Sequence, residues 1–76
     1  MKTYRVRNPR ELGRVIAEIR HRRGLRQVDL AHAALLHRSY LARLENGHAT
    51  EQLQRLFALV RELGYEVTLI EQRADG

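Results

Sequence analysis

Side chains that donate hydrogen bonds recur along one segment near the middle of the chain. Arg38, Ser39 and Arg43 are spaced so that a helix would bring them to one face, where the small Ala42 leaves room beside them. Arginine can donate two parallel hydrogen bonds to O6 and N7 of guanine, and serine can donate to a base or a phosphate. These residue types therefore favour recognition of a nucleic acid.

Other chemistries lack a matching pattern. The four histidines, His21, His32, His37 and His48, include no HxxxH pair and no histidine–carboxylate cluster at metal-ligand spacing. Ser39 has no neighbouring base that would activate it as a nucleophile. No glycine-rich loop could cradle a phosphate group. We expect a protein that is not an enzyme and that needs no cofactor and no metal.

The charge of the chain is uneven. Residues 1–26 hold nine lysines and arginines against two glutamates, whereas residues 27–76 are slightly acidic, and the whole chain carries +5. A basic half of this kind favours a polyanionic partner, because phosphate neutralisation releases counterions. The absence of cysteine, of a signal peptide and of a bilayer-length apolar run predicts a cytoplasmic protein.

Four helices are predicted to position the polar segment. Asn8 and Pro9 begin the first helix and Gly24 ends it, because asparagine caps, proline suits the first turn and glycine accepts the left-handed conformation after a helix. The second helix is expected over Gln27–Ala34 and the third over Arg38–Asn46. Small or apolar residues are expected where these two helices pack: Leu30, Ala31, Ala34, Leu36, Leu41 and Leu44.

The fourth helix is expected between a Thr50 cap and Gly64. One face of it is predicted to point inward with Leu53, Leu56, Phe57, Val60 and Leu63. All of these elements fit one domain over residues 1–76, since a chain of this length forms a single small core. The two-helix motif occupies residues 27–46 of that domain.

Both ends of the chain contain candidate strands. Thr3–Arg7 alternates in polarity, and Tyr65–Glu71 is rich in β-branched residues, so that a strand is expected within 65–72. Gln72–Gly76 is expected to fray. A lone strand leaves its backbone groups unpaired, so the C-terminal strand must pair with the same strand of a second subunit or with the N-terminal segment. We favour the second subunit, with the N-terminal segment as an addition to the same sheet.

The central residues resemble the Xre/Cro-type helix-turn-helix family. The resemblance rests on Gly24-Leu25-Arg26-Gln27-Val28-Asp29-Leu30-Ala31 and on Ser39-Tyr40-Leu41-Ala42-Arg43-Leu44-Glu45-Asn46-Gly47. It implies a lambda-repressor-like, all-α domain of four to five helices whose third helix enters the major groove of double-stranded DNA. It also implies an inward ion pair between Glu45 and Arg20. The DNA contacts that we expect are Arg26, Gln27, His37, Arg38, Ser39, Tyr40, Arg43, Asn46 and His48.

Three positions depart from the family pattern. Leu35 stands at the motif turn, where the family often has glycine; if its φ is positive, Leu35 carries roughly 1–2 kcal/mol of strain. His37 stands where a serine or threonine usually caps the third helix, and Arg26 replaces a threonine or asparagine. The turn geometry and the phosphate contacts are therefore open. Tyr40 is equally open, since it can contact a phosphate or pack against the second helix.

The two ends narrow the resemblance to the HipB-type antitoxins, which have a basic Tyr-Arg-Val-Arg start and a terminal Leu-Gly-Tyr-Glu-Val-Thr-Leu-Ile strand. This implies a homodimer that represses its own operon at a palindromic operator and binds a HipA-like kinase toxin. The implied dimer contacts are Tyr65, Val67, Thr68, Leu69 and Ile70. Alternatives are a stand-alone or phage-derived Xre regulator, a module that only neutralises a protein partner, and an RNA-binding protein, which the scarce aromatic residues disfavour.

Overall fold

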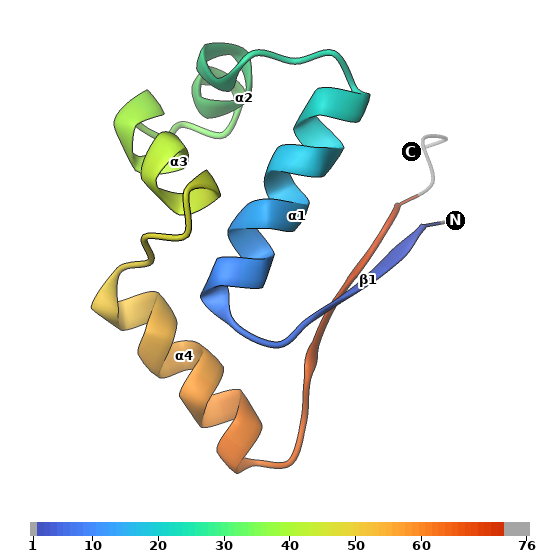
Figure 1. Cartoon of the computed structure of the whole chain (residues 1–76), viewed down its shortest axis with the longest axis vertical. Helices are drawn as coiled ribbons and strands as arrows, with labels where there is room; N and C mark the ends of the chain where they lie inside the picture. Colours follow the sequence, from blue (N-terminus) through green and yellow to red (C-terminus); the bar gives the residue numbers. More distant parts are fainter. Residues whose placement is uncertain (1, 73–76) are drawn as a thin grey trace.

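The computed structural model describes residues 2–72, and this part of the chain forms four helices and a two-stranded sheet (Figure 1). The elements are β1 Thr3–Val6, α1 Pro9–Arg22, α2 Gln27–Ala33, α3 Arg38–Glu45, α4 Glu51–Glu62 and β2 Val67–Ile70. α1 lies in the middle, with α2 and α3 on one side and the strands on the other (Figure 1). The predicted helical, lambda-repressor-like fold is confirmed. The predicted fraying of residues 73–76 lies outside the described residues.

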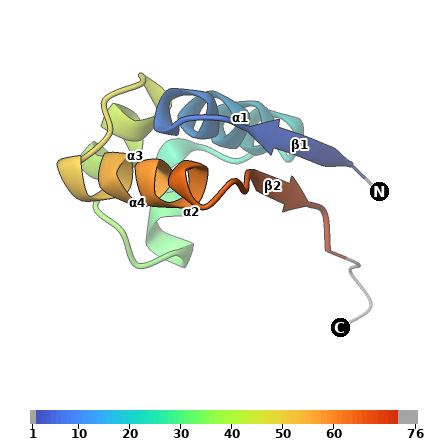
Figure 2. The same ribbon diagram turned by 90° about the horizontal axis from the view of Figure 1, so that it is seen from below.

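β1 and β2 pair in antiparallel register, with Tyr4 opposite Leu69 and Val6 opposite Val67. These four residues form the inner face, since Val6 is buried and the other three are half-buried. The sheet extends from one end of the helical part (Figure 2). Of the two pairing partners that the sequence left open for β2, the single chain uses the N-terminal segment, whereas we had favoured a second subunit. Because β1 of the same chain pairs with the backbone groups along one edge of β2, that edge needs no second subunit.

α1 begins and ends where its cap residues predict. The Asn8 side chain accepts a hydrogen bond from the backbone N–H of Glu11 at 2.8 Å, and Pro9 occupies the first turn. Gly24 has φ +67°, and its N–H donates to the carbonyl of His21 at 3.0 Å. Four apolar residues that recur at helical spacing on α1 are half-buried: Leu12, Val15, Ile16 and Ile19. α1 thereby supplies the surface on which the other elements pack.

α2 and α3 form the helix-turn-helix motif. Ala31 is 2% exposed, which lets the two helices approach closely, and Leu41 and Leu44 are buried behind α3. Two of the residues that we expected at the crossing are not covered: Ala34 is exposed, and Leu36 is 43% exposed. Both lie at the end of α2 and in the turn, where a seven-residue helix has no neighbour left to cover them.

The motif turn keeps the left-handed conformation at a position that lacks glycine. Leu35 has φ +59°, and its side chain is almost fully solvated at 93% exposure. The backbone therefore carries the strain of an L-residue in this region, and no packing of the side chain offsets it. Leu35 is the only residue other than glycine with positive φ among residues 2–72.

Replacing Leu35 with glycine is expected to raise the free energy of unfolding by about 1 kcal/mol. Relief of roughly 1–2 kcal/mol of strain exceeds the roughly 0.5–1 kcal/mol that glycine gains in the unfolded chain. Leu35→Ala is the matched control, because it removes the same exposed side chain and keeps the Cβ that causes the strain. Urea denaturation of the two variants decides the matter, and a glycine variant less stable than the alanine variant would refute the argument.

α4 is only partly covered by the rest of the chain. Thr50 caps it as expected, accepting from the N–H of Leu53 at 3.2 Å, and Phe57 is buried at 6% exposure. The predicted inward face is wrong in its width, because Leu56 and Leu63 are 55% and 67% exposed. Helical periodicity places these leucines beside Phe57, but the described chain contains no element that covers them.

Candidate nucleic-acid interface

The polar face of α3 is the centre of the candidate interface. Arg38, Ser39 and Arg43 are exposed, and Ala42 lies half-buried among them. Leu41 and Leu44 point the opposite way and are buried, so the polar face is fixed from behind. The predicted grouping of donors on one solvent-facing side of the third helix is therefore present in the structure. Such a face has the shape and the donors that base edges in the major groove require.

Both arginines on this face have their donors available. The ion pairs between residues 2–72 involve neither Arg38 nor Arg43, and no side chain of the described part accepts a hydrogen bond from either. A guanidinium with five unused donors can bind guanine bidentately or a phosphate without first breaking an internal pair. This separates the two α3 arginines from Arg20 and Arg26, whose donors are used inside the chain.

The loop after α3 carries two further expected contacts. Asn46 ends the helix, Gly47 has φ +87°, and the N–H of His48 donates to the carbonyl of Arg43 at 2.8 Å. Asn46 and His48 are both exposed. The turn back to Arg43 holds them next to the C-terminal end of the polar face.

Arg10 lies beside this loop and was missed by the sequence analysis as a candidate contact. A Cβ added at Gly47 would meet the Arg10 side chain, 3.2 Å from its Cγ and 3.7 Å from its Nε. Arg10 is exposed, and it takes no part in the ion pairs of residues 2–72. The only sequence signal was the general basic charge of the first 26 residues, which does not say which arginines reach the loop.

Tyr40 and His37 flank the polar face. Tyr40 is 37% exposed and borders an open groove whose other residues are Thr50 and side chains of α4. His37 occupies the cap position of α3, but its side chain makes no capping hydrogen bond. Its ring therefore remains exposed at the helix start.

Arg26 is exposed, but its side chain is already hydrogen-bonded to Asp29. Its Nε and Nη2 donate to Asp29 at 2.9 Å each, and its backbone N–H donates to the same carboxylate at 3.1 Å. The hydrogen bonds from the Arg26 side chain, followed by the one from its backbone, hold the pKa of Asp29 below its ordinary value. Because an exposed pair of this kind contributes little to stability, Arg26 can exchange Asp29 for a phosphate at small cost.

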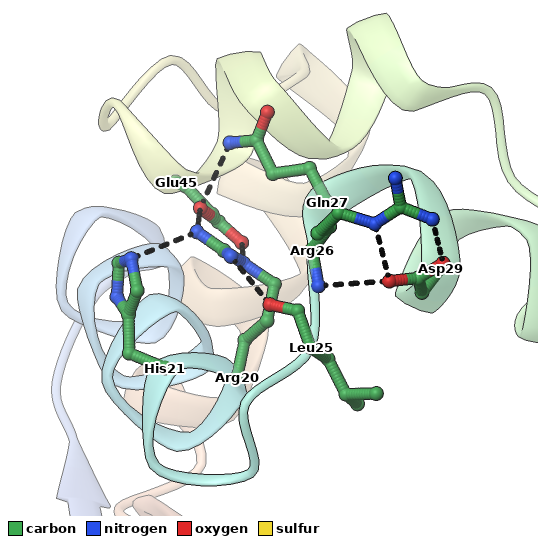
Figure 3. A network of polar contacts seen from close by, with 7 residues as sticks. All are labelled: Arg20, His21, Leu25, Arg26, Gln27, Asp29 and Glu45. Atoms are coloured by element: carbon green, nitrogen blue, oxygen red, sulfur yellow. Dashed lines mark hydrogen bonds and ion pairs between the residues drawn. The ribbon is translucent and has the colours of Figure 1, made fainter.

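Arg20 and Glu45 form the inward ion pair that the resemblance implied (Figure 3). Nε and Nη2 of Arg20 donate to the two carboxylate oxygens at 2.7 and 2.9 Å, and Nη1 donates to the carbonyl of Leu25 at 2.8 Å. The side chains are only 9% and 5% exposed. This clamp joins α1, the loop before α2 and the end of α3, so it sets the angle at which the polar face leaves the protein.

Gln27 belongs to the same clamp. Its Nε2 donates to Glu45 at 3.0 Å, and the residue is half-buried (Figure 3). The hydrogen bonds from Arg20, more than the weaker one from Gln27, hold the pKa of Glu45 below its ordinary value against the opposing effect of burial. We expected the Gln27 side chain to face DNA; its amide nitrogen instead points inward, because the buried carboxylate is the stronger acceptor within reach.

The described residues contain neither a group of metal ligands nor a helix that could span a membrane. No three histidine, aspartate or glutamate side chains within residues 2–72 lie close enough to hold a metal ion. None of the described helices combines the length and the apolar character that crossing a bilayer requires.

Comparison with known proteins identifies the family. A helix-turn-helix family model matches residues 16–70, which span the second half of α1 and all of α2, α3, α4 and β2. Comparisons with curated proteins and with solved structures gave no match. Since the match covers well over half of the sequence and includes the whole clamp and the polar face of α3, the chain belongs to the Xre-type helix-turn-helix family of DNA-binding transcription regulators.

Proposed function

We propose that this chain is a sequence-specific repressor that binds a palindromic operator as a homodimer and controls its own operon. The observation that carries the proposal is the polar face of α3, where exposed Arg38 and Arg43 have no internal partner among residues 2–72. Direct reading of bases needs such donors on a rigid helix, while the basic first half supplies salt-dependent attraction to phosphates. Occupation of the promoter then blocks transcription.

A homodimer fits this function, because a twofold axis would set two copies of α3 about 34 Å apart, one turn of DNA. The resemblance places the contact on β2 and the residue before it: Tyr65, Val67, Thr68, Leu69 and Ile70. In the single chain β1 covers one edge of β2, and the N–H of Glu71 donates to the carbonyl of Lys2 at 2.9 Å. Because the N–H groups alternate along a strand, those of Thr68 and Ile70 point to the free edge, where a second copy can add.

The second part of the proposal is an antitoxin role, with a HipA-like kinase toxin as partner. It is supported by the sequences at the two ends of the chain, which carry the HipB-type resemblance and form β1 and β2. The protein would act in the bacterial cytoplasm, at the nucleoid. A gel shift on the DNA upstream of its own gene, with and without the product of the adjacent gene, tests both parts. A shift that the adjacent product does not alter favours a stand-alone Xre regulator, and no shift with retained binding of that product favours a pure interaction module.

Arg43→Ala is expected to weaken binding to the operator by about 1–3 kcal/mol, or roughly 5- to 150-fold in Kd, if its guanidinium pairs with a guanine. Binding to a scrambled duplex should weaken much less, so sequence preference falls. Arg61→Ala is the matched control, because it removes an exposed arginine of α4 that lies outside the polar face. Fluorescence titration of both variants on both duplexes measures the effect. Operator binding by Arg43→Ala equal to that of the control would remove Arg43 from the interface.

A further inference from the structure

A groove separates the C-terminal end of α1 from the sheet, on the opposite side of α1 from α3 (Figure 1). Residues 19, 22 and 23 line it from the end of α1, and residues 2, 4 and 69–72 line it from the sheet and its ends. Its volume of about 600 Å³ lies within the roughly 300–1,000 Å³ of small-molecule sites. We propose that this α1–sheet groove binds a small organic anion, namely a carboxylate on an apolar body.

The floor of the groove is apolar. Tyr4 of β1 and Leu69 of β2 lie opposite each other in the sheet, and Ile19 of α1 lines the groove with them. All three are half-buried, so part of each side chain stays open to a ligand. Ile70 also lines the groove and is 62% exposed. Contact with an apolar body would remove water from these side chains, which favours binding.

Three cations that form no ion pair within residues 2–72 line the same groove: Lys2, Arg22 and Arg23. All three are exposed. Nη1 of Arg22 reaches the Tyr4 hydroxyl only at the long distance of 3.5 Å, and Nζ of Lys2 lies 5.8 Å from the centroid of the Tyr4 ring. The guanidinium donors of Arg22 and Arg23 are therefore available for the two oxygens of a carboxylate.

Two acidic side chains near the groove already accept other hydrogen bonds. Glu71 lines the groove, and its Oε1 accepts from the backbone N–H of Lys2 at 3.1 Å. Glu18 accepts the hydrogen bond of the Tyr4 hydroxyl at 2.9 Å. The cations outnumber these two carboxylates, and neither carboxylate is paired with the arginines of the groove. The local charge therefore favours an anion as the ligand.

The apolar floor and the cations together select the ligand. Inorganic phosphate can pair with the arginines, but it leaves the apolar floor in water. An uncharged ring covers the floor, but it leaves the cations without a partner. A carboxylate joined to a ring or an aliphatic chain satisfies both, because the arginines can donate to its two oxygens while its body displaces water from the floor.

The position of the groove separates this ligand from the operator. The polar face of α3 lies on the other side of α1, so DNA bound there would leave the α1–sheet groove open (Figure 1). The inference therefore goes beyond the proposed function and does not depend on it. Its test needs no DNA.

The probe is 2-naphthoate, whose flat ring and single carboxylate match the floor and the cations, and 2-naphthamide is its uncharged control. NMR titration of the full, isotope-labelled chain follows the backbone amides. We expect saturable shifts at residues 19–23 and 69–72, with a Kd on the order of 1 mM for a ligand of this size. The amide and inorganic phosphate, which each offer only one of the two features, should both bind more weakly.

Substitutions at the groove test the two kinds of contact separately. Arg22→Gln/Arg23→Gln should weaken 2-naphthoate about fivefold, as expected for the loss of two exposed ion pairs, and should leave 2-naphthamide unchanged. Ile70→Thr keeps a β-branched residue in the strand but removes apolar surface, so it should weaken both compounds. Arg61→Gln is the matched control, because it removes an exposed arginine of α4 outside the groove and should change neither.

Three results would overturn the proposal. The first is the absence of saturable shifts at the groove. The second is a set of shifts centred on Leu56 and Leu59, which would mean that 2-naphthoate binds the exposed leucines of α4 instead. The third is equal binding of 2-naphthoate by the wild type and by Arg22→Gln/Arg23→Gln, which would remove the arginines from the site.

Discussion

Replacement of Gly13 by alanine is expected to lower the free energy of unfolding by about 3 kcal/mol. Gly13 lies where α1 crosses α3, and a Cβ there would stand 1.8 Å from the carbonyl oxygen of Leu44 and 2.8 Å from its carbon. Both are backbone atoms, which cannot rotate away as a side chain can. The helices must therefore move apart, and overpacking of this kind costs about 1–3 kcal/mol or more. The Arg20–Glu45 clamp, which spans the same crossing, would be stretched with it.

The expected loss of stability at position 13 is opposite in direction to the usual effect of replacing glycine by alanine in a helix. At an exposed helix position, alanine is more favourable than glycine by about 1 kcal/mol. Position 14, which is exposed and next in sequence, provides the control: Arg14→Ala should be more stable than Arg14→Gly by that amount. At position 13 the order of alanine and glycine should reverse. Thermal or urea denaturation of the four proteins measures both steps, and a Gly13→Ala variant more stable than the wild type would contradict the close approach.

The boundaries of the helices could be predicted because local chemistry decides them. Asn8 and Thr50 cap α1 and α4 by hydrogen bonds to the third residue of each helix, and Gly24 and Gly64 follow the helix ends with positive φ. The strain at Leu35 was foreseeable for the same reason, since the family pattern marks that position as left-handed. Each of these features depends on a few neighbouring residues.

What could not be predicted depends on residues distant in sequence. Periodicity places Leu56 and Leu63 beside Phe57, but the width of the buried stripe depends on which elements cover α4. Gly13 gave a weak signal as a glycine inside a helix, yet nothing in the sequence named Leu44 as its neighbour. Gln27 turns inward only because Glu45, eighteen residues away, offers a buried carboxylate. The polar face of α3 was predicted well, since it needs only the helix and its two buried leucines.

The Glu45 carboxylate holds α3 to both α1 and α2. Glu45 accepts hydrogen bonds from Arg20 on α1 and from Gln27 on α2, while its own backbone belongs to α3. All three helices of the interface are thereby fixed relative to one another through two oxygen atoms. Within the described residues, no buried side-chain nitrogen or oxygen lacks a hydrogen-bond partner. Removal of Arg20, Gln27 or Glu45 would therefore leave a polar group of the remaining residues buried without a hydrogen bond.

Glu45→Ala is therefore expected to destabilise the fold by about 3–5 kcal/mol, because it leaves the buried Arg20 guanidinium without its counter-charge. The double variant Arg20→Met/Glu45→Ala should recover part of this loss, since the orphaned charge is then gone. Asp29→Asn is the control, because it breaks an exposed ion pair and should cost at most about 1 kcal/mol. Denaturation of the four proteins at neutral pH measures these differences. A Glu45→Ala variant no less stable than Asp29→Asn would show that the clamp contributes nothing.

The decrease of the free energy of unfolding at acid pH gives a second measure of what Glu45 contributes. The pKa of Glu45 is lowered in the folded state, mainly by its hydrogen bonds from Arg20, so the unfolded chain binds this proton first as the pH falls. Its contribution is complete above the ordinary value of 4.5 and is lost as the pH falls through the lower folded value. Glu45→Gln removes this titration, so its free energy of unfolding should decline less steeply than that of the wild type below about pH 4.5. Asp29, whose pKa is also lowered, keeps its own share of the decline in both proteins. Parallel curves for wild type and Glu45→Gln in that window would mean that the carboxylate gains nothing from Arg20, and the clamp would then orient α3 by shape alone.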